Sequence, residues 1–105
     1  MLIVIDLSEG RVLLQDPADF TRFAVATEGE GDLREVVRQS GLGRLRDDGV
    51  HVVVDPVALR ALAGTAATDE WDQGFAGMRD YAAGRGWVEA DGGIVAHIER
   101  RDEGG

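Results

Sequence analysis

Two Asp-Pro steps follow apolar runs in this chain and constrain its fold more than any other feature. They are Asp16-Pro17, after VLLQ, and Asp55-Pro56, after VVV. An Asp side chain at an N-cap accepts hydrogen bonds from free amides of the first helical turn. Pro suits the first helical position because the amide hydrogen it lacks has no partner there. The sequence therefore predicts a strand, a sharp turn and a helix twice, through either an internal repeat or a chance recurrence of a common motif.

Apolar periodicity and capping residues place the other elements along the chain. We expect helices over 17–27, 33–40, 56–63 and 69–83, and strands over 2–7, 11–15, 50–54, 87–89 and 94–99. A short hairpin arm over 44–46 would precede a turn at Asp48-Gly49. Phe20 and Phe23 would lie on the apolar side of the helix over 17–27. The predicted fold class is α+β: a single mostly antiparallel sheet of four to five strands with about four helices, in the order ββααβααββ. Residues 1–99 would form one domain, and 100–105 a flexible tail of acidic and basic residues.

The composition of the chain excludes several kinds of chemistry. The 105 residues carry a net charge of −9, all eleven basic residues are Arg, and Cys and Lys are absent. This pattern is typical of a GC-rich, actinobacterial-type genome. Without Cys there is no disulfide, thiolate nucleophile or cysteine-ligated metal. The negative charge disfavours nucleic acid and anionic membranes as partners. The apolar N-terminal run has no basic residues before it and no cleavage site, so we expect a cytoplasmic protein.

No catalytic or cofactor-binding motif is present, so the sequence assigns no catalytic residue, no cofactor and no metal. The side chains with chemical potential are His51 and His97, in separate predicted strands, together with Asp6 and Tyr81. If the two strands were neighbours, both imidazoles and a nearby carboxylate would converge, an arrangement that resembles a facial metal triad. The alternative is that each ring points outward, which the position of His51 off the face of its neighbouring valines favours.

Two glycines interrupt the apolar pattern of the predicted helix 69–83. Gly74 and Gly77 each cost about 1 kcal/mol relative to Ala in a helix interior. We considered close packing within the same fold, a dimer interface, and a ligand lying over the exposed backbone.

Two hypotheses for function follow. In the first, the chain is not an enzyme but a protein-interaction or accessory module that self-associates as a homodimer or binds another protein. Its interface would include Gly74 and Gly77, or a sheet edge. In the second, it is a small enzyme or small-ligand-binding protein with a pocket between sheet and helices. Both imidazoles in one cleft, within hydrogen-bond reach of a carboxylate, would favour the second hypothesis. A two-fold patch over the glycines would favour the first.

Overall fold

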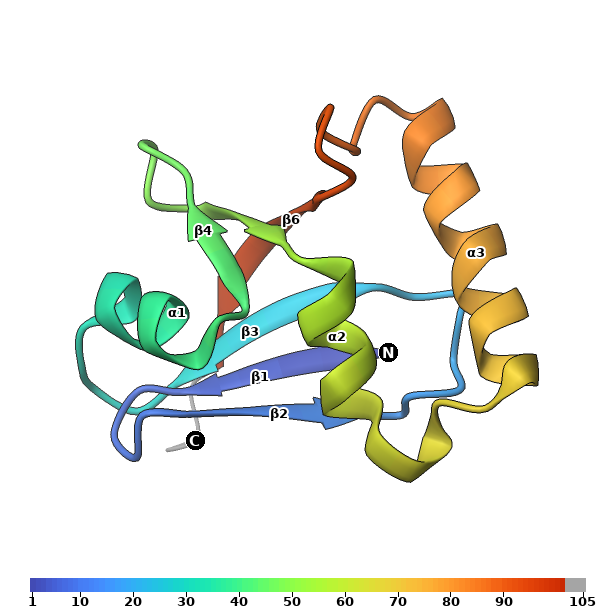
Figure 1. Cartoon of the computed structure of the whole chain (residues 1–105). Coiled ribbons are helices and arrows are strands. Elements are labelled where there is room, and N and C mark those ends of the chain that lie inside the picture. The colour runs from blue at the N-terminus through green and yellow to red at the C-terminus, as the bar shows by residue number, and fades with distance from the viewer. Residues whose placement is uncertain (102–105) are drawn as a thin grey trace.

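The computed structural model describes residues 1–101, which form an α+β fold with one curled sheet (Figure 1). Its strands are β1 (Leu2–Asp6), β2 (Arg11–Gln15), β3 (Ala24–Glu28), β4 (Gly43–Leu45), β5 (His51–Val54) and β6 (Ile94–Arg100). Its helices are α1 (Leu33–Ser40), α2 (Pro56–Ala63) and α3 (Asp69–Gly84), with a short 3₁₀ turn, η1, over Gly64–Ala66. Within these residues there are thus six strands and three α-helices in the order βββαββααβ. The prediction was four to five strands and about four helices in the order ββααβααββ.

The sheet is mixed in direction, with three antiparallel and two parallel strand pairings. Its strand order is β2-β1-β3-β6-β5-β4. β3 lies in the middle and runs parallel to both β1 and β6, whereas the other three pairings are antiparallel. Figure 1 shows α1 and α2 on one side of the curled sheet and α3 beyond the end of the sheet where β3 begins. The mixed order brings the first and last strands of the chain into the same sheet and places the two predicted histidine strands side by side.

One face of the sheet supplies most of the core. Along β1, Ile3 and Ile5 are fully buried on this face, and the register places Val25 of β3 beside Ile3. Val52, Val54, Ile94 and Ala96 continue the same layer across β5 and β6. The helices add Leu59, which is fully buried, and the stripe Trp71, Phe75, Met78 and Ala82 of α3. Burial of one large aliphatic side chain stabilises a fold by about 1.5–3 kcal/mol, so this layer is the main source of stability.

The helices begin where local capping signals predicted. The side chains of Asp32, Asp55 and Thr68 accept hydrogen bonds from backbone amides in the first turns of α1, α2 and α3. Helix α1 ends at Gly41, whose φ of 72° is the left-handed conformation that glycine adopts without a steric penalty. The predictions of helices over 33–40 and 56–63 are confirmed, and that over 69–83 is confirmed with one further residue.

The first Asp-Pro step does not start a helix, and the helix predicted over 17–27 was wrong. Asp16 has a φ of 49°, so it is not in the extended conformation of an N-cap. Residues 17–23 form turns and irregular chain, and 24–28 form β3. Only the second step, at Asp55, caps a helix. The two halves of the chain therefore do not share a repeated structural unit at these steps.

Contacts from distant parts of the chain override the helical signal after Asp16. The indole nitrogen of Trp71 donates to the Pro17 carbonyl at 2.8 Å. The Met1 amino group donates to the carbonyls of Asp19 and Arg22, both at 2.8 Å. A helix would need such carbonyls for its own i to i+4 bonds. We call residues 16–23 the docked segment, because they are held against α3 and the start of β1.

The remaining sequence predictions have mixed outcomes. The hairpin of β4 and β5 around Asp48-Gly49 is confirmed. The strand predicted over 87–89 is reduced to one bridge, Val88 to Ile94. Arg100 belongs to β6, not to a tail, and residues 102–105 of the predicted tail lie outside the described residues. Across residues 1–101, each helix is too short or too polar to cross a lipid bilayer.

Candidate functional site

The pairing of β5 with β6 places the two histidines of the chain side by side. His51 and His97 are register partners on the face of the sheet opposite Val52 and Ala96. Their ring centroids are 5.1 Å apart, and the rings meet edge to face at 68°. As predicted, His51 lies on the face of β5 opposite Val52 and Val54, yet its ring also meets that of His97. Convergence requires the antiparallel register of two strands that lie more than forty residues apart in the chain.

A carboxylate completes this cluster from the β4–β5 turn. Asp48 Oδ2 lies 2.7 Å from His51 Nδ1. Asp48 Oδ1 accepts from the backbone amides of Val50 at 2.9 Å and His51 at 3.1 Å, which fixes the carboxylate in place. The Val50 amide and then the His51 imidazole hold the pKa of the Asp48 carboxyl below its ordinary value. Because an ionised carboxylate only accepts, Nδ1 of His51 carries a proton, and in the neutral ring Nε2 is an acceptor.

The histidine pair opens into a pocket of about 520 Å³ between the docked segment, α3 and the β5–β6 part of the sheet. We call it the histidine pocket. Its aromatic lining residues are Phe20, Phe23, Tyr81 and Trp87, with the two histidines. Its polar lining residues are Thr21, Arg46 and Glu99. The rest of the lining is small or aliphatic: Ala24, Met78, Ala82, Gly86, Ile94, Val95 and Ala96. Such a mixture of apolar walls and few polar groups is typical of small-molecule sites.

An exposed aromatic pair forms one side of the pocket. Tyr81 is 63% exposed and Trp87 is 44% exposed, and their ring centroids are 6.3 Å apart in an edge-to-face arrangement. The guanidinium carbon of Arg85 lies 5.1 Å from the Trp87 centroid and 6.0 Å from that of Tyr81. Large aromatic side chains usually bury their surface, so an exposed pair beside a pocket marks a surface suited to binding.

Ion pairs account for part of the charge around the histidine pocket. Arg46 donates to Glu89 at 3.1 Å, and Arg44 approaches the same Glu89 oxygen at 3.6 Å. Glu99 lies on the same face of β6 as His97 and is exposed. Its carboxylate is the acidic group among the lining residues. The lining therefore combines an arginine already neutralised by an acid with a solvent-exposed carboxylate.

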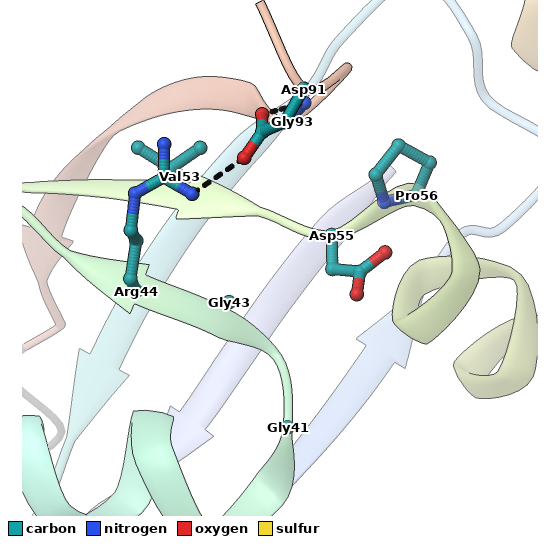
Figure 2. A pocket seen from close by; sticks show the side chains of 8 residues that line it. All are labelled: Gly41, Gly43, Arg44, Val53, Asp55, Pro56, Asp91 and Gly93. Atoms are coloured by element: carbon teal, nitrogen blue, oxygen red, sulfur yellow. Dashed lines mark hydrogen bonds and ion pairs between the residues drawn. The ribbon is translucent and has the colours of Figure 1, made fainter. Parts of the chain in front are cut away.

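A second hollow lies near the C-terminal end of β5 and is shown in Figure 2. It has a volume of about 330 Å³ and lies between Gly43, Arg44, Asp91 and the start of α2. Arg44 Nη1 and Asp91 Oδ2 are 2.8 Å apart, and Asp91 Oδ1 accepts from the Gly93 amide at 2.9 Å. The Gly93 amide and then Arg44 hold the pKa of the Asp91 carboxyl below its ordinary value.

The charged groups of this second hollow are thus engaged in structural contacts. Asp55 caps α2 through the Val57 amide. Gly43 leaves no room for a side chain, because an added Cβ would overlap the Val53 carbonyl. We therefore treat the histidine pocket as the candidate site.

The structure brings together three of the four residues predicted for ligand binding. His51, His97 and Tyr81 all line the histidine pocket. Asp6 does not: it lies at the β1–β2 turn, where its carboxylate accepts from the Glu9 amide at 3.0 Å. In residues 1–101, no three His, Asp or Glu side chains are arranged to hold a metal ion.

The two glycines of α3 have different surroundings. Gly74 faces the docked segment, and an added Cβ would come within 2.6 Å of Phe20 Cδ2 and closer still to Cε2. The missing side chain therefore permits close packing within the chain. An added Cβ at Gly77 would meet nothing within 4 Å, because Gly77 lies on the exposed side of the helix. An interface at Gly77 stays a prediction.

Sequence reasoning missed several residues of the pocket. Phe20 and Phe23 were assigned to the inner face of a helix that does not form, and Asp48 was assigned to the turn alone. A signal for Asp48 was present, since a tight turn at Asp48-Gly49 before His51 places a carboxylate next to the first residue of the returning strand. No comparable local signal marked the phenylalanines. Comparison with known proteins assigns no family, because no protein-family model, curated protein or solved structure matches the chain significantly.

Proposed function

We propose that this protein binds a small organic ligand in the histidine pocket. The observation that carries the proposal is the convergence of His51, His97 and Tyr81 in one cavity of about 520 Å³ with aromatic walls. The volume lies within the range of about 300–1,000 Å³ typical of ligand sites. The three walls come from different parts of the chain, which supports a preformed cavity and not a chance gap beside one loop.

The lining favours a ligand with a flat apolar body and a polar group. Phe20 and Phe23 offer apolar surface on the docked segment, and Trp87 offers it across the pocket. Phe20 is itself held in place by an edge-to-face contact with Trp71, with ring centroids 6.0 Å apart. The imidazoles of His51 and His97 supply the hydrogen-bonding groups at the sheet. Aromatic stacking contributes about 0.5–1.5 kcal/mol per pair beyond burial, so such a ligand gains from both walls.

Binding is a better-supported function than covalent catalysis. The hydroxyl of Thr21 donates to Asp19 at 2.6 Å, so it is not paired with an imidazole. A serine- or threonine-type nucleophile needs a base within hydrogen-bond reach. The Asp48–His51 pair supplies a base without a neighbouring nucleophile among the described lining residues. We therefore assign the pair a role in orienting a hydrogen bond to the ligand.

A titration with tryptophol, an uncharged indole alcohol, tests this function. We expect saturable NMR shifts of backbone amides in 20–24, 78–82 and 94–97, with a dissociation constant in the millimolar range or below. The Val95→Phe variant would fill the pocket from the outer face of β6 and should weaken binding at least tenfold. Leu13→Phe is the matched control, because Leu13 is an exposed sheet residue outside the pocket. The proposal would be rejected if the amide shifts were scattered over the surface, or if the Val95→Phe variant bound tryptophol as tightly as the unchanged protein.

A further inference from the structure

We propose that the histidine pocket selects an organic cation: an ammonium or amidinium group on an aromatic body. This inference rests on the proposed function and adds the charge of the ligand. It is carried by two independent observations, the balance of charges around the pocket and the guanidinium that already lies over its aromatic rim.

The charges near the pocket sum to a negative value when the imidazoles are neutral. Arg46 lines the pocket and Arg85 lies over its rim, giving two positive charges. Glu99 lines it, Glu89 holds Arg46, and Asp48 holds His51, giving three negative charges. Arg44 and Asp91, which pair with each other beside Glu89, cancel. The difference is −1, within a chain of net charge −9. Such a field concentrates cations at the pocket and repels anions.

Arg46 is also less available to an anion than Glu99 is to a cation. Arg46 is engaged by Glu89 at 3.1 Å, so an incoming carboxylate would compete with an ion pair already formed. Glu99 is exposed on the face that carries His97. A ligand cation placed near Glu99 would gain a charge-assisted hydrogen bond, which is stronger than a neutral one.

Arg85 shows that the aromatic rim attracts a cation. Its guanidinium lies over Trp87 at 5.1 Å and over Tyr81 at 6.0 Å, both within the range of cation–π contacts. Arg85 follows the C-terminus of α3 on an exposed stretch of chain, so it can be displaced without unfolding a core element.

Three probes of nearly the same shape test the inference: tryptamine, a cation; tryptophol, neutral; and indole-3-acetate, an anion. We expect tryptamine to bind about fivefold more tightly than tryptophol at pH 8 and low salt, because one exposed charge pair is worth up to about that factor. Indole-3-acetate should bind more weakly than tryptophol. Equal affinities at pH 8, or tightest binding of the anion, would overturn the inference.

Single-charge variants identify the groups responsible. Glu99→Gln should reduce the affinity for tryptamine about fivefold and leave tryptophol binding unchanged. Glu9→Gln, at the β1–β2 turn and outside the pocket, is the matched control and should change neither. Arg85→Gln should strengthen tryptamine binding. If Glu99→Gln has no effect on tryptamine binding, the charge assignment is wrong.

The two proposals fail in different ways. If all three probes bind in the pocket with the same affinity, the proposed function stands and the charge selection is refuted. If none of the three shifts the resonances of the pocket, both proposals fall.

Discussion

Replacement of the two α3 glycines by alanine should have opposite effects on stability, although both lie in the same helix. At Gly77 an added Cβ meets nothing within 4 Å, and φ is not positive. Gly77→Ala should therefore stabilise the fold by about 1 kcal/mol, the difference in helix propensity. At Gly74 the same methyl group would run into the Phe20 ring, which packs on Trp71 with centroids 6.0 Å apart.

The expected size of the Gly74 effect follows from two opposing contributions. Alanine gains about 1 kcal/mol of helix propensity, as at Gly77. Overpacking a closely fitted contact costs about 1–3 kcal/mol, because the Phe20 ring must leave its place against Trp71. The net change for Gly74→Ala is then between zero and about 2 kcal/mol of destabilisation. The two variants should differ by about 1–3 kcal/mol.

Urea unfolding followed by circular dichroism at 222 nm measures both variants on one scale. A Phe20→Ala background removes the obstacle, so in that background Gly74→Ala should regain the stabilisation seen for Gly77→Ala. If Gly74→Ala stabilises the otherwise unchanged protein as much as Gly77→Ala does, the docked segment does not lie against α3. The pocket that depends on this arrangement would then be wrong as well.

Further predictions concern capping, acid stability, association and the exposed imidazole. Asp55→Ala should cost about 1 kcal/mol in urea unfolding, because α2 loses the acceptor for the Val57 amide; an unchanged midpoint would contradict the cap. Because the pKa of Asp48 is lowered, its ionised carboxylate stabilises the fold fully above the ordinary carboxyl pKa of 3.8, and this contribution is lost as the pH falls below that value. Asp48→Asn should therefore make the free energy of unfolding depend less on pH in the acid range. If the chain self-associates through α3, Gly77→Leu should lower the mass measured by sedimentation equilibrium, and equal masses would count against that interface. His97→Ala should leave the urea midpoint nearly unchanged because the ring is exposed, and a large drop would place His97 in the core.

The features that the sequence predicted correctly are those decided within a few residues. Asp32, Asp55 and Thr68 each cap a helix because the acceptor and the amide that it binds are at most three residues apart. The Asp48-Gly49 turn likewise sets the short β4–β5 hairpin. These signals hold because few alternative conformations satisfy the same backbone groups.

The first Asp-Pro step failed because a distant contact outweighed the same local signal. Asp16-Pro17 and Asp55-Pro56 have the same residues at the N-cap and at the first helical position. The carbonyl of Pro17 is bound by Trp71, more than fifty residues away, and Val25 is fully buried between β1 and β6. Tertiary burial of this kind overrides helix propensity, which amounts to less than 1 kcal/mol for most residues.

Among the residues that line the histidine pocket, the sequence singled out His51, His97 and Tyr81 and missed the phenylalanine wall. His51, His97 and Tyr81 were identifiable because few side chains in this sequence carry such chemistry. Their convergence depends on the register of β5 and β6, which no residue near either histidine determines. The aromatic walls depend on where the docked segment lies, and that follows from contacts of Trp71 and Met1 with backbone carbonyls.

Intermolecular NOEs between a bound neutral probe and the side chains of the pocket test the binding proposal most directly. For tryptophol in saturating excess, we predict cross-peaks from the indole protons to Phe23 of the docked segment, to Trp87 beyond α3 and to His97 of β6. Cross-peaks to all three walls require the cavity described here to be open and occupied. A spectrum in which tryptophol contacts only exposed residues elsewhere, such as Leu13 or Val57, would contradict the account.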